Sequence, residues 1–218
     1  MDAEQTWHLI HQQRLAIGDL LDGLIPAQWE SPSLCDAWRI RDVAAHLTTV
    51  PMPPSPGSLF VDLVRARGSF HRLNNLATRR RAARPTAQIV ADLRAHAASR
   101  EVPIVSNVRN VLFDVLVHGQ DIAIPLGIHL PVPLDAAAAG ASRVWSMGWP
   151  FWAKRRLRGM RLTATDTEWS VGSGAEIRGP IRALLLLLTG RTSAAAPLLS
   201  GEGVTHAANR STTNRSTT

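Results

Sequence analysis

The chain has 218 residues, of which 45% are hydrophobic and 19% charged, so it can bury a core and is neither disordered nor fibrous. Its net charge of +7 comes from dispersed arginines, apart from clusters at residues 79–84 and 154–158 that we interpret as solvated helix ends. A single cysteine excludes an internal disulfide, and the longest apolar run, Ala183 to Leu188, is too short to span a bilayer. The first residues also lack a secretory signal, so we expect a cytoplasmic protein. The short apolar run predicts no membrane partner, and the dispersed arginines predict no nucleic-acid partner.

Most of the chain is predicted to be helical. Apolar residues recur at spacings of three and four, which predicts helices over about residues 4–24, 39–50, 59–81, 86–100, 107–123 and 134–151. Proline and glycine residues separate these segments, because neither favours a helix interior. In the second helix the spacing places His46 on the apolar face with Val43, Leu47 and Val50. His46 is therefore expected to point inward.

The C-terminal quarter of the chain has a different pattern. Short β-prone segments at about 161–164, 168–171 and 175–178 are separated by turn residues and predict strands. Gly179 and Pro180 then begin a buried helix that Gly190 ends. A domain boundary is expected near residues 153–159. The repeated NRSTT of residues 209–218 has no apolar residue to bury and is predicted to be disordered.

One helix carries a candidate metal site. Asp114 and His118 are four residues apart in the predicted helix 107–123, so their side chains share a face and can bind one cation. His46 from another helix could add a third ligand and leave positions open for water or substrate. Asp121 is either a partner that orients a ligand or a solvated carboxylate. Spacing alone also allows an ordinary polar pair at Asp114 and His118 and a hydrogen-bonded core histidine at position 46. The other histidines show no ligand spacing.

Three segments in the same order resemble one known family. They are WESPSLCDAWRIRDVAAHL (29–47), DVLVHGQDIAIPLG (114–127) and LRGMRLTATDTEWSVGSGAEIRGPIRALLLLLTGR (157–191). Together they resemble the mycothiol-dependent maleylpyruvate isomerase family of actinobacteria, within the wider DinB-like superfamily of metal-binding four-helix bundles. The resemblance implies an α-helical four-helix, DinB-like bundle over residues 1–155 and a small α+β C-terminal domain over residues 156–208, before the tail at 209–218.

The resemblance also implies roles for individual residues. The family's metal ligands fall on His46, Asp114 and His118, although the characterised isomerase has Glu in place of Asp114. Asp121 and Arg191 match two further family positions and are the candidate catalytic residues, with Arg191 expected either to hold an anionic substrate or to be a helix-end cation. The implied cofactors are a divalent metal, expected to be zinc, and mycothiol as thiol cosubstrate.

The leading functional hypothesis is therefore an enzyme, an isomerase or a transferase. A metal-activated small-molecule thiol would attack an electrophilic or anionic substrate, because metal binding deprotonates a thiol at neutral pH. Cys35 would then not be the nucleophile, and we interpret it as a small buried hydrophobic side chain.

Two alternatives remain. The chain could be a metal- or small-molecule-binding module without a reaction. It could also be a helix-turn-helix DNA-binding regulator, although the connection over residues 48–55 is long and contains three prolines, unlike such a turn.

Overall fold

The computed structural model describes residues 1–52, 70–102, 106–205 and 207, and its contacts divide the chain into two compact units. One unit comprises Asp2–Leu130, and the other comprises Pro131–Thr218 together with Met1. The predicted helix over residues 59–81 lies partly outside the described residues, and the predicted disordered tail lies wholly outside them. None of the described helices is both long and apolar enough to cross a membrane.

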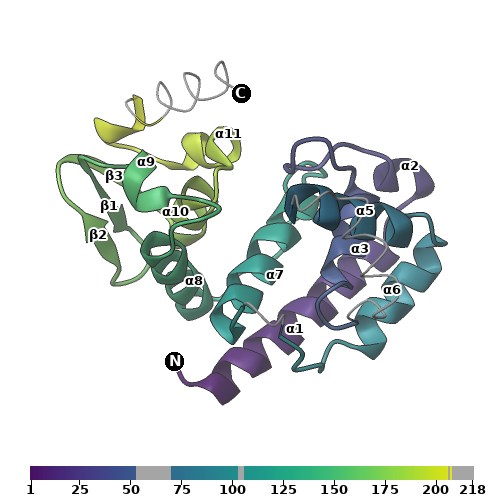
Figure 1. Cartoon of the computed structure of the whole chain (residues 1–218). Helices are drawn as coiled ribbons and strands as arrows, with labels where there is room; N and C mark the ends of the chain where they lie inside the picture. The colour runs from purple at the N-terminus through teal and green to yellow at the C-terminus, as the bar shows by residue number, and fades with distance from the viewer. Residues whose placement is uncertain (53–69, 103–105, 206, 208–218) are drawn as a thin grey trace. The chain divides into compact units, whose positions relative to one another are not determined.

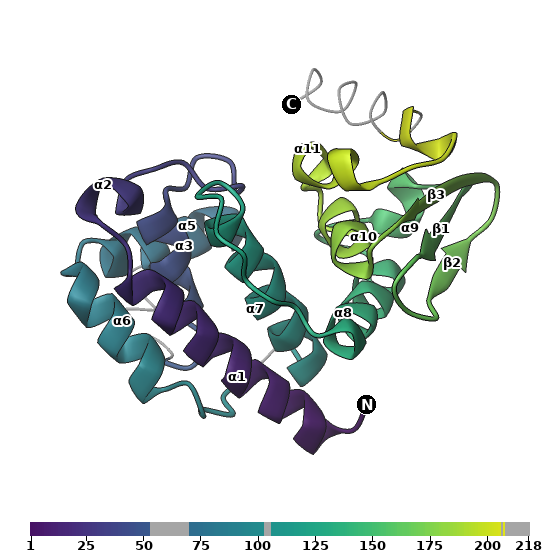
Figure 2. The same cartoon turned by 180° about the vertical axis from the view of Figure 1, so that it is seen from behind.

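The first unit is a bundle of helices. Its helices are α1 (Ala3–Asp22), α2 (Pro26–Trp29), α3 (Ile40–Leu47), α5 (Phe70–Ala82), α6 (Thr86–Ala95) and α7 (Val108–Ala123). Helix α1 packs against α6 and α7, and α3 packs against α5, α6 and α7, as both views of the ribbon show (Figures 1 and 2). The core of this bundle includes Ile10, Ile17, Val43 and Ile122, all fully buried. Helix α7 thus packs against both α1 and α3, and α3 and α7 carry the candidate site.

Two predicted helices of the bundle are shorter than expected. Helix α3 ends at Leu47 because the hydroxyls of Thr48 and Thr49 donate to the carbonyls of Ala45 and His46, at 2.7 and 2.6 Å. Helix α6 ends at Ala95 instead of near residue 100. The short α2, by contrast, lies in a segment that was expected to be a loop.

The second unit combines helices with a small sheet. It contains α8 (Leu134–Ser146), α9 (Ala153–Arg156), β1 (Met160–Ala164), β2 (Ser170–Gly172), β3 (Ala175–Gly179), α10 (Ile181–Leu188), α11 (Thr192–Ala195) and the 3₁₀ turn η1 (Ala196–Leu198). The strand order is β2-β1-β3, with β1 antiparallel to β2 and parallel to β3. Helix α10 packs against α8 and against β1 and β3. The predicted fold class, a helical bundle followed by a small α+β domain, is confirmed.

Helix α8 differs from its prediction in length and grouping. It ends at Ser146 instead of Phe151, because Met147 is already extended and Gly148 and Pro150 follow. Its contacts with α10 place it in the second unit, whereas the sequence prediction assigned residues up to 155 to the bundle. The contact boundary therefore lies at residues 130–131.

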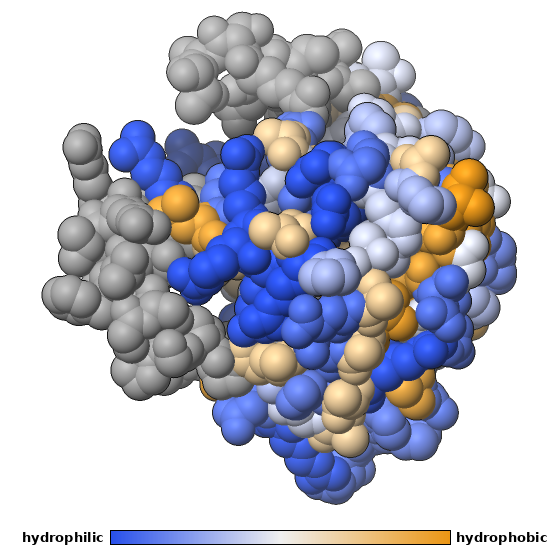
Figure 3. Space-filling view, turned by 90° about the vertical axis from the view of Figure 1, so that its right-hand side faces the viewer, coloured by the Kyte–Doolittle hydropathy of each residue, from blue (hydrophilic) through white to orange (hydrophobic). Residues whose placement is uncertain are grey.

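The surface view in Figure 3 faces the side of the helical bundle. Hydrophilic residues make up most of this face, and apolar residues lie between them in smaller groups. Isolated apolar groups of this kind are normal on a folded protein and require no partner to cover them.

A stability prediction arises at the turn between β2 and β3. Gly174 has a φ of +115°, and a Cβ there would lie 2.2 Å from the carbonyl oxygen of Gly159. We expect Gly174→Ala to lower the free energy of unfolding by about 3 kcal/mol or more, since strain and backbone clash add. Gly159→Ala is the matched control, because Gly159 has a φ of +79° but open space at its Cβ, and should cost about 1 kcal/mol. Urea unfolding measures both, and equal losses would contradict the clash.

Candidate metal site

Helix α7 presents three polar side chains on one face. Its N-terminus is capped by Asn107, whose side chain accepts a hydrogen bond from the backbone N–H of Asn110 at 3.1 Å. Within the helix, Nε2 of His118 lies 3.4 Å from Oδ1 of Asp114, and Nδ1 of His118 lies 2.8 Å from Oδ2 of Asp121. The two nitrogens of one imidazole thus face two different carboxylates.

Helix α3 supplies the second histidine. Nε2 of His46 lies 3.8 Å from Oδ2 of Asp114, and the rings of His46 and His118 meet edge to face with centroids 4.8 Å apart. The two Nε2 atoms therefore approach the same carboxylate from two helices. The inward orientation predicted for His46 is confirmed, since its side chain is 11% exposed.

The start of α3 is held by a carboxylate. Asp42 accepts hydrogen bonds from the backbone N–H and from the guanidinium of Arg39, with three contacts between 2.9 and 3.1 Å. Glu30, just after α2, accepts from both Arg39 and Arg41. Asp42 lies one turn before His46, so these bonds set the direction from which His46 enters the site.

Asp42 yields a prediction about stability and pH. Burial would raise the pKa of Asp42, but the bonds from Arg39 outweigh it and lower that pKa. A folded-state pKa below the unfolded value of about 3.9 stabilises the protein above that pH, and the contribution is lost as the pH falls through the folded-state pKa. We expect Asp42→Ala to lower the free energy of unfolding by about 1–2 kcal/mol at neutral pH.

The matched variant for this prediction is Asp42→Asn, which retains an oxygen for the backbone N–H of Arg39. It should lose less stability than Asp42→Ala, and both variants should show a weaker decline of stability between about pH 5 and pH 3 than wild type. Chemical unfolding across this pH range measures the effect. If the free energy of unfolding declined between about pH 5 and pH 3 as steeply in the variants as in wild type, the role of the Asp42 charge would be contradicted.

The loop between α2 and α3 adds two side chains that sequence reasoning did not place in the site. The Cys35 thiol donates to Oδ2 of Asp121 at 3.0 Å, and its sulfur lies 3.7 Å from Nδ1 of His118. The interpretation of Cys35 as a small buried hydrophobic side chain is wrong, because it is half-buried and hydrogen-bonded. The ring of Trp38 lies 5.2 Å from His46 and 6.3 Å from His118, and forms one wall of the site.

The carboxylates of Asp121 and Asp114 differ in how far they are buried. Asp121 is fully buried, so the alternative of a solvated carboxylate is wrong for this residue. Because a carboxylate only accepts hydrogen bonds, His118 donates its Nδ1 proton to Asp121, which leaves Nε2 as the nitrogen that can bind a cation in place of a proton. The side chain of Asp114 is 31% exposed, whereas those of His46 and His118 are 11% and 13% exposed. Asp114 therefore lies at the open side of the cluster.

The electrostatics of this cluster favour a positive charge. Burial by itself would raise the pKa of Asp114, but the two histidines outweigh it and hold that pKa far below the usual range of a carboxyl. Burial would lower the pKa of His118, yet Asp114, Asp121 and Cys35 together raise it well above its ordinary value. A cation between the Nε2 atoms and Asp114 would replace the proton that His118 otherwise holds.

The ligand atoms lie close enough together for one metal ion. In the set His46, Asp114 and His118, one ligand atom from each residue lies within 4.8 Å of the others, and the same holds for Cys35, His118 and Asp121. The second set uses the Nδ1 side of His118, where the existing hydrogen bonds already satisfy Asp121. The first set has the two nitrogens and one oxygen that suit a catalytic zinc site.

Arg191 lies in the other unit, at the N-cap of α11. Its guanidinium donates to the carbonyl of Thr189, the C-cap of α10, at 2.8 Å. This contact is what the helix-end alternative for Arg191 predicts. Its role in binding an anionic substrate stays a prediction.

Comparisons with known proteins identify the fold and its relatives. Residues 10–104 match the model of the mycothiol maleylpyruvate isomerase N-terminal domain. The solved structure of a mycothiol-dependent maleylpyruvate isomerase is 13% identical, and that of its histidine-to-alanine mutant is 12% identical. Each superposes with a TM-score of 0.63 over 93% of both chains, which at this identity shows a shared fold. No curated protein matches the sequence. The predicted resemblance to the mycothiol-dependent maleylpyruvate isomerase family is thus confirmed, by the domain match over residues 10–104 and by the fold over most of the chain.

Proposed function

We propose that this protein is a metal-dependent enzyme that uses a small-molecule thiol, mycothiol or a close relative, on an electrophilic substrate. The observation that carries the proposal is the convergence of His46, Asp114 and His118 within 4.8 Å, with Asp121 bonded behind His118. The metal is expected to be zinc, because two imidazole nitrogens and one carboxylate with an open side are a common catalytic zinc set. The structural relatives named as mycothiol-dependent support the choice of thiol.

The residues present fit such an ion. When bound, zinc would lower the pKa of a coordinated thiol and so supply a thiolate at neutral pH. Asp121 keeps His118 in the tautomer that directs the Nε2 lone pair to the ligand cluster. Asp114 contributes a negative charge between the two histidines, which offsets the charge of a divalent ion.

The other side chains of the site would position the thiol and its target. Trp38 lies against both histidine rings and shields that side of the cluster from water. Asp114 is partly exposed, so the approach of a thiol is expected from its side. Cys35 would not act as the nucleophile, because the metal-bound thiol would supply the thiolate. Arg191 would bind an anionic group of the substrate, because a guanidinium binds carboxylates in a bidentate manner.

The alternatives lead to different observations. A binding module would retain the metal and fail to turn over any thiol adduct. The second helix of the helix-turn-helix alternative would open at Pro56 and Gly57, in the segment 56–66, which lies outside the described residues. Sequence-specific retention of DNA would be its signature.

The test of the proposed function combines metal analysis with thermal shift. The purified full chain should contain about one zinc ion, and mycothiol should raise the melting temperature of the zinc-loaded protein. At a hundredfold excess over Kd, the expected stabilisation is about 2.7 kcal/mol. Glutathione is the matched thiol control, and the His46→Ala variant is the matched protein control. Zinc-loaded protein that ignores millimolar mycothiol would overturn the thiol mechanism and leave the binding module.

A further inference from the structure

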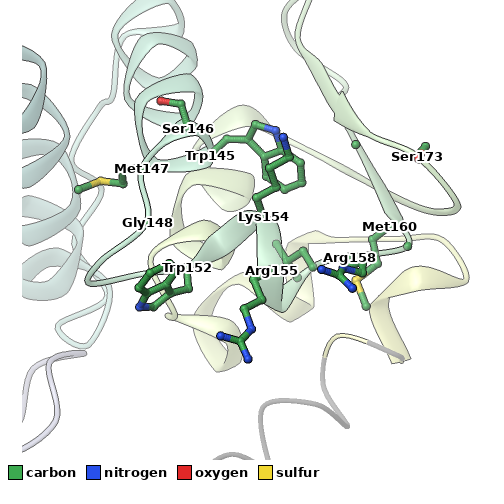
Figure 4. Close-up of a pocket in the computed structure, with 13 residues that line it drawn as sticks. Trp145, Ser146, Met147, Gly148, Trp152, Lys154, Arg155, Arg158, Met160 and Ser173 are labelled. Carbon is green, nitrogen blue, oxygen red and sulfur yellow. The ribbon is translucent and has the colours of Figure 1, made fainter.

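The second unit contains a pocket far in sequence from the candidate metal site. The pocket has a volume of about 490 Å³ and is lined by residues of α8, α9, β1, the end of β2 and adjoining turns (Figure 4). This volume lies in the range of pockets that hold small molecules. Every lining residue belongs to the unit Pro131–Thr218, so the pocket is defined within that unit alone.

The charged side chains that line the pocket are all positive. Lys154, Arg155 and Arg158 line it, and none of its lining residues is an aspartate or a glutamate. Within the described part of the chain, no carboxylate pairs with Lys154 or Arg155. The interpretation of this cluster as a solvated helix end is incomplete for these residues, because they surround a concave surface. A pocket of this charge attracts an anion.

A neighbouring arginine, Arg156, has a structural role in the same segment. Arg156 donates to the carbonyls of Phe151, Leu187 and Leu188, at 2.8 to 3.2 Å. It closes the C-terminal end of α10 and does not line the pocket. Of the four cations at residues 154–158, Arg156 therefore stabilises the fold, whereas Lys154, Arg155 and Arg158 line the pocket.

Two tryptophans give the pocket flat apolar surfaces. Trp145 and Trp152 both line it, and half of the surface of Trp152 is exposed. Trp152 has a φ of +49°, a left-handed conformation that is unusual and strained for a bulky residue. Gly148 lies against its ring, and a Cβ there would approach Cζ3 of Trp152 to 3.1 Å. A strained backbone thus holds a partly exposed indole at the pocket.

We propose that this pocket binds a small aromatic carboxylate, with its ring against Trp152 or Trp145 and its carboxylate on Lys154, Arg155 or Arg158. A planar ring matches the indole faces, which favour stacking with other aromatic groups. An anionic group is required to balance the cations, since Lys and Arg form their strongest hydrogen bonds with carboxylates and phosphates. The pocket is independent of the metal site, so its test can fail without contradicting the proposed enzymatic function.

The experiment measures binding of 2-naphthoate to the full chain by calorimetry, after divalent ions have been removed by chelation. Without divalent ions, 2-naphthoate cannot bind through a metal, so the measurement does not report on the candidate metal site. Two variants alter the pocket: Lys154→Gln combined with Arg155→Gln removes charge, and Trp152→Asn removes the indole with a residue that tolerates positive φ. Arg178→Gln is the matched control, because Arg178 is exposed in the same unit, faces Glu176 and does not line the pocket.

We expect 2-naphthoate to bind wild type with a Kd below about 1 mM, and each pocket variant to bind at least about tenfold more weakly. Arg178→Gln should stay within about twofold of wild type, and 2-naphthol and inorganic phosphate should each bind more weakly than 2-naphthoate. The proposal is overturned if wild type does not bind, or if the pocket variants match Arg178→Gln. It is also overturned if phosphate binds as tightly as 2-naphthoate, or if a dT oligonucleotide displaces 2-naphthoate with a steep salt dependence, which would indicate a nucleic-acid surface.

Discussion

Replacing His118 or His46 with alanine is expected to lower zinc affinity more than about 100-fold. This loss exceeds the one expected from mutating a residue that only hydrogen-bonds a metal ligand. Each histidine directs Nε2 toward Asp114, and each variant would leave only one nitrogen and one carboxylate. Competition with a chromogenic chelator measures the affinity. His129→Ala is the matched control, because His129 is exposed and belongs to neither ligand set, and it should bind zinc as wild type does.

Variants of Asp114 test the same set of ligands. Asp114→Ala should weaken zinc binding as much as the histidine variants do, whereas Asp114→Glu keeps the carboxylate and should retain the metal. Full metal occupancy in both the His46→Ala and His118→Ala variants would show that these residues are not the ligands. Metal loss in His118→Ala with full occupancy in His46→Ala would instead favour the cluster of Cys35, His118 and Asp121, which Cys35→Ala would then test.

Replacing Asp121 with asparagine is expected to weaken zinc binding about 10- to 100-fold, although Asp121 is not itself proposed as a ligand. Its buried Oδ2 accepts from Nδ1 of His118 and from the Cys35 thiol, and an amide provides a weaker acceptor without charge. His118 would then lose the carboxylate that sets its tautomer. Chelator competition on folded protein, checked by circular dichroism, measures the loss.

The matched variant for Asp121 is Cys35→Ala. It removes the other hydrogen bond to Asp121 and leaves the bond between Asp121 and His118 intact. Its effect on zinc affinity should be clearly smaller than that of Asp121→Asn. If Asp121→Asn binds zinc as wild type does, Asp121 serves only as the hydrogen-bond acceptor of the Cys35 thiol and the His118 imidazole and does not tune a metal ligand.

The sequence alone was sufficient for the elements that follow from local periodicity. Helix α7 was predicted as residues 107–123 and is observed as Val108–Ala123, because its apolar stripe and the Asn107 cap are local features. The same periodicity placed Asp114, His118 and Asp121 on one face and turned His46 toward the core. Helix ends were less accurate where side-chain hydroxyls or an extended residue stopped the helix, as at Thr48 and Met147.

The tertiary structure decided which distant residues meet. Periodicity describes one helix at a time, so it could not measure the 3.8 Å between His46 and Asp114 or bring the loop residues Cys35 and Trp38 to the site. The quoted segment LCDAW was the only sequence signal for that loop, because loops lack a period. Packing against α10 likewise placed α8 with the C-terminal unit, and only the folded backbone showed that Lys154, Arg155 and Arg158 border a pocket while Arg156 supports a helix end. Composition and spacing determine which side chains can share a helix face, whereas the chemistry of a site depends on distances between elements that only packing sets.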